Sequence, residues 1–383
     1  MTKCPHSMRN DMKRLFASAT AISLMLCGGL YAQNALAASA GCDWDSSSAV
    51  KAPLDTRLTI GGYVTVGEDL PIGSVIYSQR IQTNGNGASL LCRAGVYDLV
   101  NTVISAPHGQ SSYRDATFPT VFNTNISGVG VALWQGTPDG NSGSHLQLPG
   151  RLTAFFSPSS ESVFNFTGQD DAAVSFNIAM IKIAANIGSG TISSSDLPRF
   201  KTSFDGNGES FVYQQARIVG NLTAIPATCN VGNNYYLPLG EHYPDEFNGI
   251  GSTAGSAETQ IVLSGCPAFY GSTSYGVFKP NVISLKLTPR NGFIDAERGI
   301  SKLNTTAGDA ASGVGVQLSF RQENGNYQWA KFNQGINLAN YITFLEDRGS
   351  DYSLGVKATY VQTSTPIRAG RADAQIEFMI TYQ

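Results

Sequence analysis

The most informative stretch of this sequence is Gly370-Arg-Ala-Asp-Ala-Gln-Ile-Glu-Phe-Met-Ile-Thr-Tyr-Gln383. From residue 372 onward, every second position carries a small or apolar side chain, namely Ala372, Ala374, Ile376, Phe378, Ile380 and Tyr382. Successive residues of a β-strand point to opposite faces, so this spacing predicts a strand with one apolar face. Alternation alone indicates no more than the last strand of a β-domain.

The same two-residue period recurs through the chain, whereas the period of a helix does not. Apolar residues alternate over residues 283–287 and again over residues 314–320. Turn dipeptides such as Asp205-Gly206 and Asn324-Gly325 separate such runs and are typical of β-hairpins. Many short strands with frequent turns predict an all-β protein built from sandwiches.

The first 40 residues have the three features of a secretory signal peptide. Lys13 and Arg14 precede an apolar run over residues 15–30, and small-x-small sites follow at residues 35–37 and 38–40. This combination directs export, and the apolar run is too short to span a membrane. We therefore expect cleavage near residue 37 or 40 and an exported mature chain.

The charge balance argues against partners that need a basic surface. Residues 1–40 contain four of the 25 basic and one of the 28 acidic residues, which leaves 21 basic and 27 acidic residues and a net charge of −6. Nucleic acids and anionic membranes both need a basic face. We therefore expect no nucleic-acid partner.

Four cysteines remain after the signal peptide, and four cysteines allow three pairings. They form two close pairs that lie 137 positions apart, so the most economical arrangement is Cys42–Cys92 and Cys229–Cys266. An exported protein provides the oxidising setting for such bonds. A zinc site is the alternative, but no C-x-x-C occurs and three histidines remain. We expect two disulfides, no metal and no cofactor.

The mature chain, roughly 340 residues long, has the size of two domains. Each half has its own cysteine pair, and S-G-V-G-V-x-L occurs in both, at residues 127–133 and 312–318. Residues 222–227 contain a stiffening proline. We predict two related immunoglobulin-like β-sandwiches, residues 41–221 and 228–383, joined by a connector over residues 222–227.

Three motifs characterise residues 228–383: Leu263-Ser-Gly-Cys266, Gly313-Val-Gly-Val-Gln-Leu318, and the ending with Gly370 and Tyr382 in register. With these motifs, this half resembles a fimbrial pilin domain of the bacterial chaperone–usher pathway. The resemblance implies a sandwich that lacks its last strand. It implies three partners: a periplasmic chaperone, an outer-membrane usher, and an adjacent subunit that donates a strand. The interface residues that it assigns are Gly370, Ile376, Phe378, Ile380 and Tyr382.

The motifs of residues 41–221 are Asp69-Leu-Pro-Ile-Gly-Ser-Val-Ile76, Cys92-Arg93, the run 121–130 and Gly188-Ser-Gly-Thr191. With them, this half resembles the receptor-binding domain of fimbrial tip adhesins, closest to the MrkD type of type 3 fimbriae. The resemblance implies a protein at the fimbrial tip on the bacterial surface that binds a host glycan or an extracellular-matrix protein. The alternative is a structural adaptor or minor pilin without receptor binding.

Two polar loops in the first half are candidates for receptor binding. Val129, Val131 and Leu133 share one face of a predicted strand, so we expect Trp134 on the opposite, exposed face. An aromatic platform beside polar groups suits a sugar or a protein surface, and the following loop supplies Asp139, Asn141 and His145. The second loop contains Tyr113, Arg114 and Asp115. The alternative for each is an ordinary surface loop, and for Trp134 a side chain that caps the sandwich edge.

No motif predicts an enzyme. The sequence has no G-x-S-x-G, and residues 205–209, Asp-Gly-Asn-Gly-Glu, lack the later glycine and glutamate of a calcium loop and so predict a hairpin. Asp170-Asp171 and the pair Asp295 and Glu297 are the candidates for paired carboxylates, but solvated turn charges are far commoner. We therefore expect a binding protein without catalytic residues.

Overall fold

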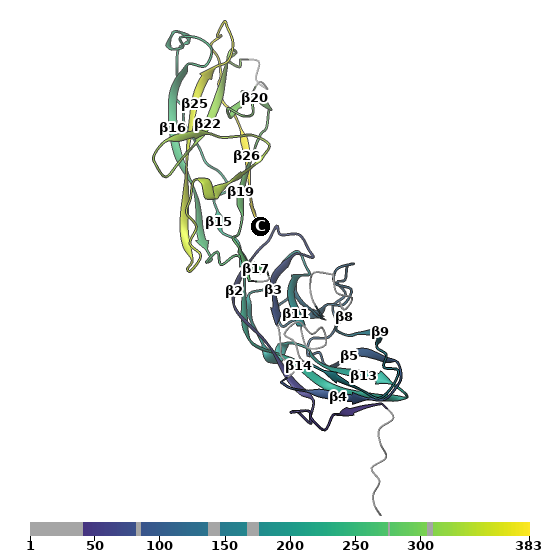
Figure 1. Cartoon of the computed structure of the whole chain (residues 1–383). Helices are drawn as coiled ribbons and strands as arrows, with labels where there is room; N and C mark the ends of the chain where they lie inside the picture. The colour runs from purple at the N-terminus through teal and green to yellow at the C-terminus, as the bar shows by residue number, and fades with distance from the viewer. Residues whose placement is uncertain (1–40, 82–85, 137–145, 167–175, 275, 305–308) are drawn as a thin grey trace, which may run out of the picture. The chain divides into compact units, whose positions relative to one another are not determined.

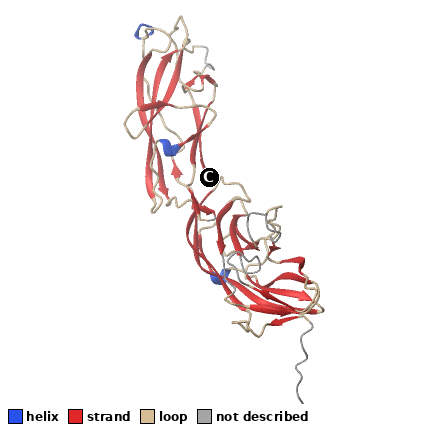
Figure 2. Cartoon of the chain, in the orientation of Figure 1, coloured by secondary structure: helices blue, strands red, loops and turns tan. Residues whose placement is uncertain are grey.

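The computed structural model describes residues 41–81, 86–136, 146–166, 176–274, 276–304 and 309–383. These residues form β-strands with only short helical turns, η1 (Ser194–Asp196), η2 (Pro244–Glu246) and η3 (Leu338–Asn340) (Figure 2). The predicted all-β class is confirmed. The predicted signal peptide lies outside the described residues, and no described helix is long and apolar enough to cross a membrane.

Three sheets contain the strands of the first half. One has the order β12-β14-β13-β5-β9 with β2 parallel to β14, and another is β1-β4-β10. The third has the order β18-β17-β3-β11-β7-β6 with β8 on β7, where β17 is Ser272–Ser274 and β18 is Val277–Lys279. The strands are β1 (Cys42–Trp44), β2 (Leu54–Gly67), β3 (Val75–Ile81), β4 (Ser89–Cys92), β5 (Tyr97–Ser105), β6 (Phe122–Asn123), β7 (Val129–Gln135), β8 (Leu146–Gln147), β9 (Gly150–Phe156), β10 (Ser162–Asn165), β11 (Phe176–Lys182), β12 (Gly190–Ser193), β13 (Arg199–Gly206) and β14 (Glu209–Ala227).

Strands β7 and β11 are covered on both faces, because every one of their residues is buried. Val131 and Leu133 of β7 pack on one face in the main core of the first half. The other face belongs to a separate apolar cluster made of Phe118, Val121, Ala132, Trp134, Ala179 and Ile181. A strand buried on both faces is expected to have a continuous apolar sequence, and β7 reads Val-Gly-Val-Ala-Leu-Trp-Gln.

Two sheets enclose the core of the second half. The larger has the order β15-β16-β25-β22-β21-β20 with β23 on β22, and the smaller is β24-β19-β26 (Figure 1). Between the two sheets lie buried residues such as Leu263, Leu285 and Phe320. The strands are β15 (Asn230–Val231), β16 (Thr253–Cys266), β19 (Ile283–Pro289), β20 (Phe293–Asp295), β21 (Ile300–Ser301), β22 (Val314–Arg321), β23 (Tyr327–Trp329), β24 (Gly335–Asn337), β25 (Ser350–Gln362) and β26 (Ile376–Tyr382).

Residues 222–227 are strand rather than the connector that we expected. They form the end of β14 and pair with residues 62–67 of β2. The strands β17 (Ser272–Ser274) and β18 (Val277–Lys279) lie in the second half of the sequence but extend a sheet of the first half, because β17 pairs in parallel with β3. Both departures depend on pairing between residues far apart in the sequence, which local patterns do not reveal.

Candidate functional site

The second half contains an open groove with a volume of about 1190 Å³. One side is the extended segment 231–240, which we call the groove wall, and the other is the segment 371–378 that enters β26. The floor is apolar, because every second residue of a strand points into the sandwich. The floor residues come from β16, β22 and β25 and are Ile261, Val316, Leu318, Phe320, Val356 and Ala358.

Strand β26 is paired along one edge only. It is antiparallel to β19 from Ile376 opposite Pro289 to Tyr382 opposite Ile283. Among the described residues, no strand pairs with its other edge. Such an edge presents backbone N–H and C=O groups that can pair with a further strand.

The hydrogen bonds at the end of β26 reveal which backbone groups face the open edge. The N–H of Tyr382 donates to Asp69 Oδ2 at 2.8 Å and its carbonyl accepts from the N–H of Asp69 at 3.0 Å, so both groups point away from β19. Backbone direction alternates along an antiparallel strand. The N–H and C=O groups of Ile380, Phe378 and Ile376 therefore point to the open edge as well.

The groove wall has the same two-residue pattern without strand pairing beyond Val231 in the described chain. Tyr235, Leu237 and Leu239 are half-buried against the core, whereas the residues between them are exposed. The rings of Tyr235 and Phe378 approach across the groove with 5.8 Å between their centroids. Two extended segments thus flank an apolar floor at the position where a sandwich would have another strand.

Gly370 lies where the chain passes close to another backbone segment. A Cβ atom at this position would be 2.3 Å from the carbonyl oxygen of Asp309 and 2.7 Å from the nitrogen of Ala311. The N–H of Arg371 donates to the Asp309 carbonyl at 2.9 Å, which holds the two segments together. Glycine therefore permits a close approach of the two backbone segments at this position.

Both predicted disulfides are present. Cys42–Cys92 joins β1 to β4, and Cys229–Cys266 joins the residue before β15 to the end of β16. Each bond therefore lies within one half of the sequence, as the spacing of the four cysteines predicts.

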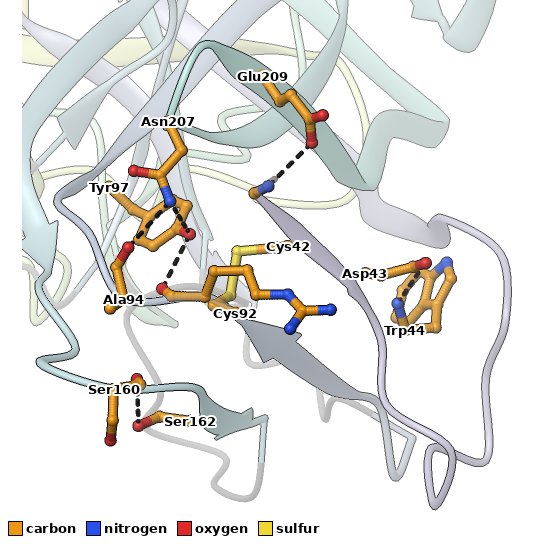
Figure 3. The surroundings of a disulfide bond; sticks show 12 residues. Cys42, Asp43, Trp44, Cys92, Ala94, Tyr97, Ser160, Ser162, Asn207 and Glu209 are labelled. Carbon is orange, nitrogen blue, oxygen red and sulfur yellow. Dashed lines mark hydrogen bonds between the residues drawn. A yellow bond between two sulfur atoms is a disulfide. The ribbon is translucent and has the colours of Figure 1, made fainter. Parts of the chain in front are cut away.

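Hydrogen bonds around Cys42–Cys92 connect it to the β13–β14 hairpin (Figure 3). The hydroxyl of Tyr97 donates to the carbonyl of Arg93 and accepts from Asn207 Nδ2, both at 3.0 Å. Glu209 accepts from the N–H of Gly41 at 2.9 Å. This end of the first half is therefore held together by the disulfide and by partly buried hydrogen bonds.

The prediction that Trp134 is exposed is wrong. Its side chain is on the face opposite Val131 and Leu133, as the alternation predicts, but only 5% of the residue is exposed. Phe118 covers it, with 6.0 Å between the ring centroids. Alternation identifies the face of a strand but not whether another segment covers that face. Asp139, Asn141 and His145 lie outside the described residues.

The second candidate loop contains an internal pair. The hydroxyl of Tyr113 donates to Asp115 Oδ2 at 2.5 Å, and this hydrogen bond raises the pKa of Tyr113 to about 12 and lowers the pKa of Asp115. The other carboxylate oxygen of Asp115 accepts from the N–H groups of Thr117 and Phe118. Arg114 is exposed beside this pair. The loop is therefore braced by its own hydrogen bonds, and Arg114 is its outward-facing charge.

Neither the groove wall nor the burial of Lys182 was predicted from the sequence. The alternation of Tyr235, Leu237 and Leu239 is visible in the sequence and was the available signal. Lys182 is 1% exposed and donates to the carbonyls of Gly67 and Glu68. Burial lowers the pKa of Lys182. No local pattern marks a lysine at the end of an apolar strand as buried.

The second half is thus a sandwich with an open strand edge beside an apolar groove in the described chain. Residues 217–383 match the family described as Fimbrial protein, and residues 57–218 match the MrkD-like receptor binding domain. The chain therefore joins a domain of the MrkD-like receptor-binding family to a domain of the fimbrial protein family. The resemblances inferred from the sequence are confirmed.

Solved structures of fimbrial proteins are similar to this chain at low sequence identity. The CupB6 tip adhesin of Pseudomonas aeruginosa is 14% identical, with a TM-score of 0.33 over 89% of this chain and 94% of that chain. The receptor binding domain of the plasmid-born adhesin MrkD1P of Klebsiella pneumoniae is 20% identical, with a TM-score of 0.34 over 50% of this chain and 99% of that chain. No curated protein matches the chain in sequence.

Proposed function

We propose that this protein is a fimbrial tip adhesin that binds a host glycan or extracellular-matrix protein through its first half and joins the fimbria through the groove of its second half. The observation that carries the proposal is the pairing of two features in one chain. One is the match of residues 57–218 to a receptor-binding family, and the other is the open groove beside β26. A subunit that combines a strand-accepting groove with a receptor-binding domain suits the end of a fibre, where that domain can reach a receptor.

Assembly would place a donated strand between the groove wall and β26. Its backbone would pair with the outward N–H and C=O groups of Ile376, Phe378 and Ile380, and its alternate side chains would enter the apolar floor. Burying one Val, Leu or Ile side chain contributes roughly 1.5–3 kcal/mol. Four such side chains would contribute on the order of 6–12 kcal/mol before the cost of ordering the strand. That is comparable to the whole stability of a typical domain, about 5–15 kcal/mol.

We expect the chaperone and the adjacent subunit to occupy the same groove one after the other. In the periplasm a chaperone would fill the groove and hold the edge of β26, with Gly370 allowing the close approach and Tyr382 fixing the end of the strand. At the outer-membrane usher an adjacent subunit would replace the chaperone strand. The adhesin would then stand at the fimbrial tip on the cell surface, with its first half free to bind.

A donor strand fused to the protein itself tests this proposal. A flexible linker after Gln383, followed by about twelve residues that alternate Val or Ile with Thr, can turn back along β26. We expect the extended protein to accumulate as soluble protein in the periplasm without a chaperone, whereas the unmodified chain aggregates or is degraded. Tyr382→Ala should reduce capture of the unmodified chain by the chaperone.

The matched control is a fused peptide with the same residues in an order that breaks the alternation. Its apolar side chains are divided between the two faces of the strand, so neither face can cover the apolar floor of the groove. Equal solubility of the unmodified, alternating and control chains would overturn the role of the groove.

The soluble extended protein can then be applied to arrays of glycans and matrix proteins. Arg114→Ala, with Arg93→Ala as a control at a different place in the first half, tests whether the loop 113–115 takes part in binding.

A further inference from the structure

His242 connects the groove wall to the short helix η2. Its Nδ1 is 2.8 Å from Oε2 of Glu246, and its Nε2 is 2.9 Å from the carbonyl oxygen of Leu239. Leu239 lines the groove and packs against the core of the second half. The imidazole therefore bridges the last apolar residue of the groove wall and the turn that follows it.

The two partners of His242 are both acceptors. A backbone carbonyl cannot donate a hydrogen bond, and an ionised carboxylate cannot either. A neutral imidazole has a single N–H and satisfies only one of these two acceptors, whereas the imidazolium cation satisfies both. Both hydrogen bonds can therefore form at the same time only when the histidine is protonated.

The surroundings leave the ring little freedom. A Cβ atom at Gly255 of β16 would be 2.3 Å from Nε2, so the ring lies directly against the backbone there. Tyr360 of β25 packs edge-on with 5.9 Å between the ring centroids. Glu246 is the carboxylate that faces the ring from η2, the Tyr360 phenol faces it from β25, and the facing residue of β16, Gly255, carries no charge. Burial raises the pKa of Tyr360, so this phenol stays neutral over the range in which histidine titrates.

We infer that His242 is a positioning residue for the strand-accepting groove: its protonated form holds the groove wall in place, and its deprotonation releases the wall at Leu239. This inference deepens the proposed function, since it concerns how the same groove is regulated. Loss of one N–H leaves either the Leu239 carbonyl or Oε2 of Glu246 without the imidazole as its donor, so the hydrogen bond to Leu239 is no longer present in every molecule. Within the described residues the wall has no strand pairing beyond Val231, and its other contacts are side-chain packing and the hydrogen bond from the N–H of Val262 to the Tyr235 hydroxyl.

The direction of the pH effect follows from the contacts. The hydrogen bonds to Glu246 and to the Leu239 carbonyl raise the pKa of His242, and the pKa of Glu246 is lowered in return. A histidine whose pKa is raised in the ordered state stabilises that state fully below its ordinary pKa. The contribution is lost as the pH rises through the raised value. The groove wall should therefore be held most firmly in acid and open more often as the pH rises through neutrality.

Hydrogen exchange of the full-length chain, isolated from the periplasm together with its chaperone, measures this opening. Amides of residues 235–243 would be followed from pH 5 to pH 9 by mass spectrometry, with correction for the intrinsic dependence of exchange on pH. The opening constant should be flat below about pH 6.5, the ordinary pKa of histidine. It should then rise by at most about tenfold per pH unit and level off above the raised pKa. NMR titration of the imidazole gives that pKa independently.

Three variants make the test specific. Glu246→Gln removes the carboxylate and should move the rise in opening to lower pH, while His242→Gln should abolish the pH dependence of residues 235–243. His108→Gln removes the other described histidine that pairs with a carboxylate, Asp196 at 3.3 Å, and should leave the profile unchanged. A wild-type profile without the rise, an unchanged midpoint in Glu246→Gln, or a retained dependence in His242→Gln would each overturn the inference. Strand uptake is not measured here, so failure of the groove as an acceptor would appear only in the donor-strand experiment.

Discussion

Replacing Trp134 with alanine should destabilise the first half of the protein rather than remove a receptor contact. The side chain is 5% exposed and lies in the apolar cluster with Phe118, Val121, Ala132, Ala179 and Ile181. Truncating a buried tryptophan costs about 3–5 kcal/mol, because the lost burial is accompanied by a cavity. The effect should therefore be a large fraction of the stability of this half.

Urea unfolding of the full-length protein, extended by the donor strand that keeps it soluble and followed by far-UV circular dichroism, measures the effect. For a unit of this size the free energy of unfolding falls by about 2–3 kcal/mol per molar urea, so the midpoint should drop by roughly 1–2 M. If the two halves unfold in separate transitions, only the transition of the first half should move.

Trp329→Ala is the matched control. Trp329 is 50% exposed, and its main described contact is the guanidinium of Arg298, 4.8 Å from the ring centroid. An exposed cation–π contact contributes about 0.5–1 kcal/mol, so this midpoint should move by less than about 0.5 M. A Trp134→Ala shift no larger than that of Trp329→Ala would refute the placement of Trp134 in a packed cluster.

Two further predictions concern backbone packing and the disulfides. Gly370→Ala should destabilise the second half by about 1–3 kcal/mol, because the added carbon meets the backbone of Asp309 and Ala311. In the control Gly335→Ala, the atom nearest to the added Cβ is the Cβ of Ser284, 3.9 Å away, so this variant should unfold at a clearly higher urea concentration than Gly370→Ala. Equal urea midpoints would contradict the close approach at Gly370. Replacing both Cys42 and Cys92 with serine should lower the stability of the first half by about 2–5 kcal/mol. The second half, with its own disulfide, should keep its unfolding midpoint, and a joint loss would mean that the two halves unfold together.

Local patterns in the sequence were sufficient for the fold class, the cysteine pairs and the final strand. The alternation from residue 372 to residue 382 is a direct consequence of strand geometry, so β26 and its inward side chains could be read from the residues alone. The disulfides followed from spacing, because two close pairs leave one economical arrangement. Gly370 was identified by its position and explained by the backbone that passes it.

Contacts between segments far apart in the sequence determined the burial of Trp134, the strand at residues 222–227, the groove and the surroundings of His242. Trp134 is buried because Phe118 and Val121 cover the outer face of β7, and a strand's own pattern cannot reveal a covering segment. Residues 222–227 are strand because β2 pairs with them over a long sequence separation. The groove exists because the wall 231–240 and β26 flank the floor, and no strand pairing joins them in the part of the chain that the structure describes. His242 acquires two acceptors only when Leu239 and Glu246 fold around it. Alternation and cysteine spacing are properties of residues close together in the sequence. Burial, open strand edges and the hydrogen-bond partners of a side chain depend instead on which distant segments folding brings into contact.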